Sequence, residues 1–223
     1  MRILVWLSAG LVLVAVVLLW WFQPPVTPRG EAANYYPWQV EAYPDGTSRV
    51  LGLALGEARL GAARERFGDR MQLALFRAPE GDLSLEAFYS ELTLGGLTAR
   101  VILSASLPEE QLDTMRERAR NREQLDNGAL RYQLIRDDLQ AAMSARITGL
   151  TYLPAADLDE DLVRRRFGRP EDVLTAADGA RHFLYPARGL DLVLAPNGDA
   201  ALQYVPPRDF ERLRRPLRPS GDH

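Results

Sequence analysis

Hydrophobic positions follow two different patterns along this chain. Residues 3–22 form an unbroken apolar run without a charge or a proline, whereas the remainder alternates short apolar segments with turns and amphipathic stretches. At ~1.5 Å rise per residue, an apolar helix of about 20 residues spans ~30 Å, the thickness of the hydrocarbon core of a bilayer. The pattern therefore predicts a transmembrane helix within residues 1–22.

Aromatic side chains lie near both ends of this run, as is typical of a membrane–water interface. Trp6 stands near one end, and Trp20, Trp21 and Phe22 stand at the other. We take these four as membrane-interface residues and the lipid bilayer as a partner of the chain. The alternative is a cleaved signal peptide, with residues 30–32 (Gly-Glu-Ala) as a cleavage site.

Flanking charges give the predicted helix an orientation. Arg2 and the amino terminus precede it, and Arg29 is the nearby cation that follows it, so the small positive excess places the N-terminus in the cytoplasm. The C-terminal domain is then expected in the periplasm of a bacterial cell, anchored to the inner membrane by a single span. The proline-rich residues 23–33 form an extended tether.

The exported part contains a weak internal repeat. The tripeptide Arg-Phe-Gly at residues 66–68 recurs at 166–168. In each copy a single strand-like run (48–55 and 146–153) and a helical stretch precede it, and three strand-like runs follow. We expect both phenylalanines to face a core and both glycines to end a helix. The predicted structural repeat residues are Phe67, Gly68, Phe167 and Gly168.

Period-two alternation and turn residues predict the strands. Those of the first copy are 71–77, 83–92 and 97–104, and those of the second are 182–186, 189–195 and 201–205. A hairpin around residues 44–46 (Pro-Asp-Gly) is expected before the first copy. The run 83–92 also admits a helix.

Between the copies the pattern predicts a linking helix over residues 106–128, ended by the Asn-Gly pair at 127–128. Shorter helical segments are expected at 137–144 and 208–215. The predicted fold class is α+β: an N-terminal transmembrane helix followed by two helix-plus-antiparallel-three-strand modules packed together. The predicted units are a transmembrane anchor (1–22), a tether (23–33), a first module (34–105), the linking helix (106–128), a second module (129–215) and a tail (216–223).

Two stretches resemble a known family. LGEARLGAARERFG (55–68) and LDEDLVRRRFGRP (158–170), each with the strands that follow, resemble the BamE (SmpA/OmlA) family and the tandem halves of β-lactamase inhibitor protein. The whole chain resembles bacterial single-pass envelope proteins. The resemblance implies a protein that acts by binding another protein rather than by catalysis, although this chain lacks the lipidated cysteine of BamE and has two copies.

Composition excludes several function classes. A net charge of −3 and a pI near 5.5 argue against binding nucleic acid through a basic surface. The absence of cysteine excludes disulfides, zinc–thiolate sites and thiol nucleophiles, and the absence of lysine excludes Schiff-base chemistry. With two histidines, a multi-histidine metal site is also disfavoured.

The search for catalytic, metal and cofactor residues therefore yields none. His182, the internal histidine, opens a predicted strand and lacks a recognisable nucleophile motif. Asp157, Asp159 and Asp161 are spaced like the start of a calcium loop, but position six of that loop is Leu162 rather than glycine. We expect no cofactor.

The leading hypothesis is a non-catalytic, membrane-anchored interaction or scaffold module of the cell envelope, whose partner is another envelope protein. Tyr35, Tyr36 and Trp38, just after the tether, are candidate contacts because aromatic residues are enriched at interfaces. Packing in the core is the alternative for these three residues. Two further functions remain open: a small-ligand or lipid-binding module with a pocket between the two sheets, and a hydrolase of unknown type.

Overall fold

The computed structural model describes residues 35–79 and 81–218. The predicted membrane segment, with Trp6, Trp20, Trp21 and Phe22, lies outside the described residues, as do the whole tether (23–33) and the end of the tail. Among the described residues, none of the helices has the length and apolar character required to cross a bilayer.

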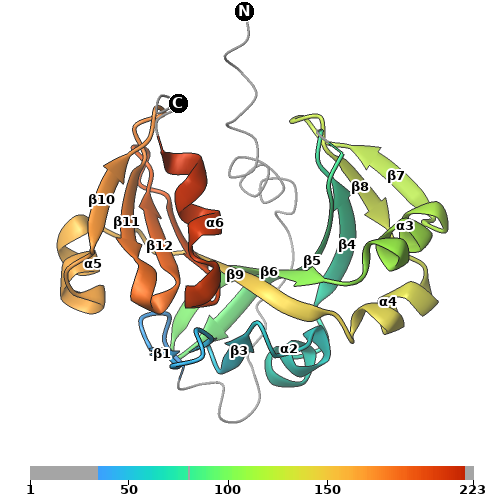
Figure 1. Cartoon of the computed structure of the whole chain (residues 1–223), viewed down its shortest axis with the longest axis horizontal. Helices are drawn as coiled ribbons and strands as arrows, with labels where there is room; N and C mark the ends of the chain where they lie inside the picture. Colours follow the sequence, from blue (N-terminus) through green and yellow to red (C-terminus); the bar gives the residue numbers. More distant parts are fainter. Residues whose placement is uncertain (1–34, 80, 219–223) are drawn as a thin grey trace, which may run out of the picture.

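A single curved, fully antiparallel sheet of ten strands dominates the structure (Figure 1). Its strand order is β10-β11-β12-β13-β9-β6-β5-β4-β8-β7. The strands are β4 (Gln72–Arg77), β5 (Leu83–Leu94), β6 (Leu97–Ser106), β7 (Asn121–Gln124), β8 (Leu130–Gln133), β9 (Arg146–Pro154), β10 (Asp172–Thr175), β11 (Arg181–Tyr185), β12 (Leu190–Leu194) and β13 (Ala200–Tyr204).

This architecture corrects the predicted fold class. The described protein is mostly β, with short helices beside one large sheet, and it is not a pair of three-stranded modules packed together. The local strands do lie close to their predicted positions in both copies. What the pattern could not show is that β9 pairs with β6 on one side and with β13 on the other, which fuses the two halves into one sheet.

Helices cover the convex face of this sheet and enclose the main core (Figure 1). They are α2 (Leu60–Phe67), α3 (Glu109–Glu117), α4 (Arg136–Ala142) and α5 (Glu160–Phe167). Alternate strand residues such as Leu85, Val101 and Leu202 point into this core and are fully or almost fully buried. Burial of this apolar face is the main stabilising contribution to the fold.

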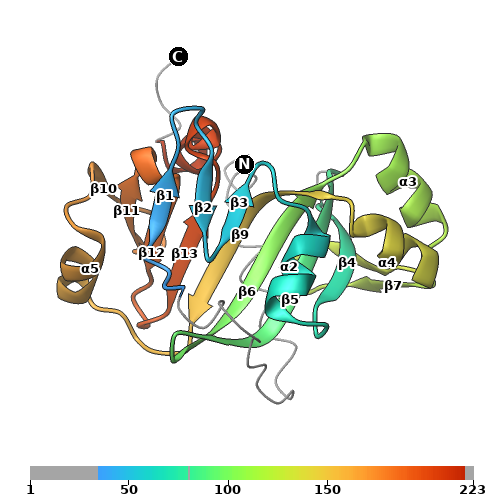
Figure 2. The ribbon, with the colours of Figure 1, turned by 90° about the horizontal axis from the view of Figure 1, so that it is seen from below.

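A small three-stranded sheet also lies on the convex side, across β9 (Figure 2). It comprises β1 (Val40–Ala42), β2 (Ser48–Val50) and β3 (Leu53–Leu55). The hairpin predicted around residues 44–46 is the β1–β2 connection. The predicted single strand at 48–55 is instead two strands, because Leu51 and Gly52 adopt positive φ angles of +49° and +78° and reverse the chain between them.

The sheet order contains an approximate two-fold repeat. From the central β13–β9 pair outward, one half runs β12, β11, β10 and the other β6, β5, β4. In both halves these three strands follow a helix that ends in Phe-Gly, α5 in one and α2 in the other. The segment from α3 to α4, inserted between β6 and β9, adds the β8–β7 hairpin outside β4 and has no counterpart beyond β10.

The predicted linking helix over residues 106–128 is present only in its first part. Helix α3 ends at Glu117, and the chain then forms the β7–β8 hairpin, whose turn contains Asn127 and Gly128. The strand at Asn121–Gln124 was missed because all four residues are exposed, so it carries no period-two apolar signal. The shorter helices expected near 137–144 and 208–215 are confirmed as α4 and as α6 (Glu211–Arg214) with its flanking 3₁₀ turns, η3 (Pro207–Asp209) and η4 (Arg215–Leu217).

Candidate functional site

The three aromatic residues predicted as partner contacts pack against the body of the protein itself. Tyr36 and Trp38 stack at 4.9 Å between ring centroids, and Trp38 meets Phe167 edge-on at 6.5 Å. The Arg66 guanidinium lies 5.0 Å from the Tyr35 ring. All three aromatics are half-buried, which supports the packing alternative and leaves only part of each ring free for another molecule.

The two Phe-Gly helix ends have matching surroundings. Phe67 packs edge-on against Tyr89 at 5.7 Å, and the Tyr89 hydroxyl donates to the Gly68 carbonyl at 3.4 Å. In the other half Phe167 lies 6.3 Å from Tyr185, whose hydroxyl donates to the Gly168 carbonyl at 3.0 Å. Each tyrosine comes from the second strand after its helix, β5 or β11. The four repeat residues are therefore structural: both phenylalanine rings are buried, whereas Gly68 is half-buried and Gly168 is exposed at its helix end.

His182 forms a buried pair with Asp191 rather than an accessible catalytic group. His182 Nδ1 and Asp191 Oδ2 are 2.8 Å apart on neighbouring strands β11 and β12, and the two side chains are 11% and 3% exposed. Burial raises the pKa of Asp191, and its hydrogen bond to His182 opposes that shift. The described residues contain no cluster of three acidic or histidine side chains that could hold a metal ion.

The concave face of the sheet is the best candidate for a functional surface. On this side, the described part of the chain places one helix, α6, which packs through Phe210 against Leu184 of β11 and Val205 after β13 (Figure 1). The middle strands β4, β5, β6 and β9 have no described helix above them. Their register with one another and with β13 sets a transverse row across this face: Gln72, Phe88, Ile102, Thr151 and Gln203. In this row Ile102 and Thr151 are buried, and the other three side chains are partly exposed.

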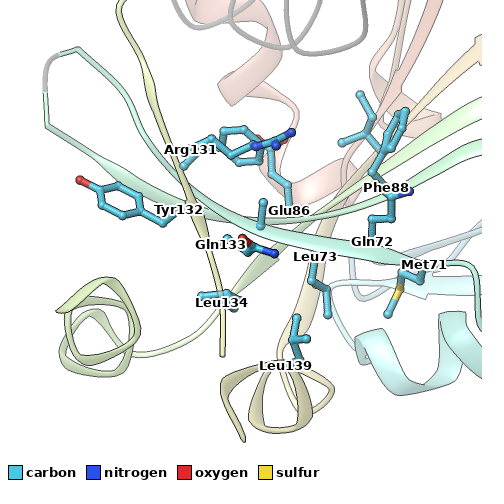
Figure 3. A pocket seen from close by; sticks show the side chains of 13 residues that line it. Met71, Gln72, Leu73, Glu86, Phe88, Arg131, Tyr132, Gln133, Leu134 and Leu139 are labelled. Carbon is cyan, nitrogen blue, oxygen red and sulfur yellow. The ribbon is translucent and has the colours of Figure 1, made fainter. Parts of the chain in front are cut away.

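A cavity of about 480 Å³ opens between β4 and β8 (Figure 3). Its size is typical of a ligand pocket. Its apolar side is formed by Leu73 of β4, Leu134 after β8 and Leu139 of α4, and Figure 3 shows Leu73 and Leu139 pointing toward one another. Its polar side, toward the concave face, is lined by Gln72, Glu86, Arg131 and Gln133.

The cavity exists because β8 leaves β4 halfway along it. Strand β4 pairs with β5 over its whole length, Gln72–Arg77, but with β8 only over Leu75–Arg77. Beyond that point β8 continues beside β7 instead, where Gln133 pairs with Asn121. Residues 72–74 of β4 therefore have a partner strand on one side and the cavity on the other.

Glu86 is the titratable group of this cavity with a strongly altered affinity for protons. It lies on β5, opposite Ala74, and its side chain is half-buried in the lining of the cavity. Desolvation raises the pKa of Glu86 to about 7, and a hydrogen bond from Ser84 opposes the rise. The carboxyl can therefore exchange a proton near neutral pH.

We expect Glu86→Gln to stabilise the protein above pH 7 and to leave it unchanged near pH 4. Between the ordinary pKa of 4.5 and about 7, the folded state holds a proton that the unfolded state releases, so the free energy of unfolding falls as pH rises through this window. The full shift would amount to roughly 3 kcal/mol, and the partial exposure of Glu86 reduces the expected gain to about 1–2 kcal/mol. Urea unfolding of both proteins at pH 4 and pH 8 measures the difference, and equal gains at the two pH values would contradict the prediction.

No sequence signal pointed to the cavity. Gln72, Glu86 and Gln133 belong to ordinary alternating strands, and their convergence depends on β8, a strand that the pattern of residues did not predict. The one available hint was Glu86 itself, an acidic residue inside an apolar strand.

Comparisons with known proteins add no assignment. A scan against protein-family models finds no match, and neither a search of curated proteins nor a search of solved structures finds one. The resemblance to the BamE family and to β-lactamase inhibitor protein therefore stays a prediction, and the function is argued from the geometry alone.

Proposed function

We propose that this chain is a non-catalytic protein-binding module of a bacterial envelope, anchored in the inner membrane by residues 3–22, with its concave sheet facing a partner protein in the periplasm. The observation that carries the proposal is the asymmetry of the sheet. Four helices and a small sheet cover its convex face, whereas the described residues place α6 alone over one end of its concave face. A sheet with one face left open offers a rigid, preformed surface to a partner.

Two features of the site favour binding over catalysis. His182 has a single carboxylate neighbour and does not line the cavity. Glu86 does line it and can exchange a proton there, but no serine, threonine or histidine joins it among the described lining residues, so a nucleophile for it to activate is missing from that set. The polar groups that do line the cavity, two glutamines, one glutamate and one arginine, are suited to hydrogen bonding and orientation. A small-ligand binding module is the second candidate, and the cavity of about 480 Å³ is the observation that favours it.

Photo-crosslinking in intact cells tests the binding face. With p-benzoylphenylalanine in place of Phe88, at the centre of the concave face, we expect a reproducible adduct with an envelope protein. The same group in place of Arg165, an exposed residue of convex helix α5, serves as the matched control and should give none. Adducts at Arg165 but not at Phe88, or no adduct at either position, would overturn the proposed face.

Membrane anchoring is tested separately. We expect the full chain to stay in the pellet after alkaline carbonate extraction, because insertion of some twenty apolar residues is strongly favourable. A variant lacking residues 3–22 should move almost entirely to the supernatant. Release of the full chain into the supernatant would contradict the proposed membrane anchor. It would not affect the proposal for the binding face, which the crosslinking experiment tests independently.

A further inference from the structure

The wall of the cavity is an incomplete β-ladder. Residues 72–74 of β4 have their backbone groups paired with β5 on one side, and no described strand pairs with them on the other. An unpaired strand edge offers a row of backbone donors and acceptors to any extended chain. Three residues of strand cover about 10 Å, which is enough to pair with a short extended peptide. A lipid tail has no backbone donors or acceptors, so it would leave this edge unpaired.

The cavity beside this edge has different surroundings on the two faces of the sheet. On the convex side the cavity is apolar, with Leu73, Leu134 and Leu139, whereas its concave side is mixed and presents Gln72 and Gln133 beside Phe88 and Ile102. An inserted strand sends successive side chains to opposite faces of the sheet. One apolar side chain of a ligand would enter the leucine-lined half, and its two neighbours would meet polar groups.

We propose that the β4–β8 cavity binds an extended peptide segment, which adds to β4 at residues 72–74 and places one apolar side chain among Leu73, Leu134 and Leu139. This inference rests on the proposed function, because it identifies the part of the concave face that recognises the partner. Backbone hydrogen bonds to β4 supply affinity, and the leucine-lined half selects the central side chain. Glu86 and Arg131 lie on the polar side, where they contact residues that flank it.

Strand β10 provides an internal control. It occupies the place equivalent to β4 in the other half of the sheet and is an edge strand, paired with β11 alone among the described strands. No described strand lies outside it, so it lacks a counterpart of the β8–β7 hairpin in this part of the chain. A ligand that recognises any free edge would protect β10 as well, whereas a ligand of the cavity would protect β4 alone.

The probe for this proposal is a displayed library of random nine-residue peptides, selected against the purified protein. We expect enrichment of sequences with a central apolar residue between polar ones. A synthetic copy of the most enriched peptide should slow hydrogen exchange at residues 72–74 by at least about tenfold, with no change at residues 172–175, because new ladder bonds protect the amides. N-methylation of the central peptide residue, which removes a backbone donor, should weaken binding at least tenfold.

Two variants fill the cavity from opposite sides. Ala74→Phe fills it from β4 and Leu139→Trp fills it from α4, and each should abolish peptide binding while circular dichroism stays unchanged. Ala201→Phe, on the same face of β13 but outside the cavity, is the matched control and should bind normally. Should one filling variant fail to fold, the other still decides the question.

Several outcomes would overturn the inference: no enriched peptide, binding that survives both filling variants, or protection of β10 to the same extent as β4. Binding of decanoate at this site, with no peptide enriched, would assign the cavity to a small apolar ligand instead. A crosslink from Phe88 to a partner together with any of these results would retain the proposed function and reject only the β4 site.

Discussion

Replacing Gly189 by alanine is expected to lower the free energy of unfolding by about 3–5 kcal/mol, one of the two largest effects predicted for this protein. Gly189 precedes β12 with φ of +65°, and a Cβ built there would overlap the carbonyl oxygen of Val205. The same glycine accepts a hydrogen bond at 2.9 Å from the Val205 amide, so the two segments cannot separate without losing it. The cost combines positive φ, about 1 kcal/mol, with the displacement of packed backbone.

Gly198 supplies the control for this prediction. It lies in the turn between β12 and β13 with φ of +93°, but a Cβ there would meet nothing within 4 Å. Gly198→Ala should therefore cost only about 1 kcal/mol, the conformational part of the effect. Urea titrations of both variants measure the difference in midpoint, and equal losses would show that the close approach of Gly189 and Val205 is not what requires glycine.

Phe67→Ala is expected to cost about 3–5 kcal/mol, because it removes a fully buried ring and leaves a cavity at the junction of α2 and β5. Thermal or urea unfolding measures the loss. Phe167, in the equivalent place at the end of α5, is 4% exposed and should give a similar value. A loss below about 1.5 kcal/mol for Phe67→Ala would mean that its surroundings collapse into the space, against the dense packing described here.

Tyr89→Phe separates the ring contact from the hydrogen bonds. The Tyr89 hydroxyl donates to the carbonyls of Ala63 at 3.2 Å and Gly68 at 3.4 Å, and its deletion keeps the edge-on contact with Phe67. We expect a loss of about 0.5–1.5 kcal/mol, the usual net value of a hydrogen bond. If Tyr89→Phe lowered the free energy of unfolding as much as Phe67→Ala, the prediction would be wrong, because the hydrogen bonds of the hydroxyl would then contribute as much as the buried Phe67 ring.

The local elements were predictable where residues face a single core. Helix α5 shows why: Glu160 and Asp161 open it, three arginines close it, and Phe167 and Gly168 mark its end. Period-two alternation likewise located β5, β6 and β12, whose convex residues are mostly buried. Their concave residues are mostly partly exposed, with Ile102 and Asp191 as buried exceptions. Both signals depend only on residues that are close together in the sequence, so the sequence alone predicts these elements.

Elements held by distant partners were not predictable in this way. Strand β10 was not predicted, and it is a strand because it pairs with β11. The linking helix was predicted too long because β7 takes its strand conformation from pairing with β8. The candidate site depends on the same kind of information. It is formed where β8 parts from β4, and neither strand signals that separation in its own residues.

The sequence by itself determined the apolar N-terminal run, the absence of thiol and lysine chemistry, the duplicated Phe-Gly helix ends and most strand positions, because each depends on composition or on spacing between near neighbours. Only the tertiary structure decided that both halves share one sheet, that helices cover its convex face, and that β4 keeps a free stretch beside a cavity. The alternation of apolar and polar side chains indicates which face of a strand is buried, but it does not indicate which strand lies beside it. That choice is made by contacts between residues far apart in the chain.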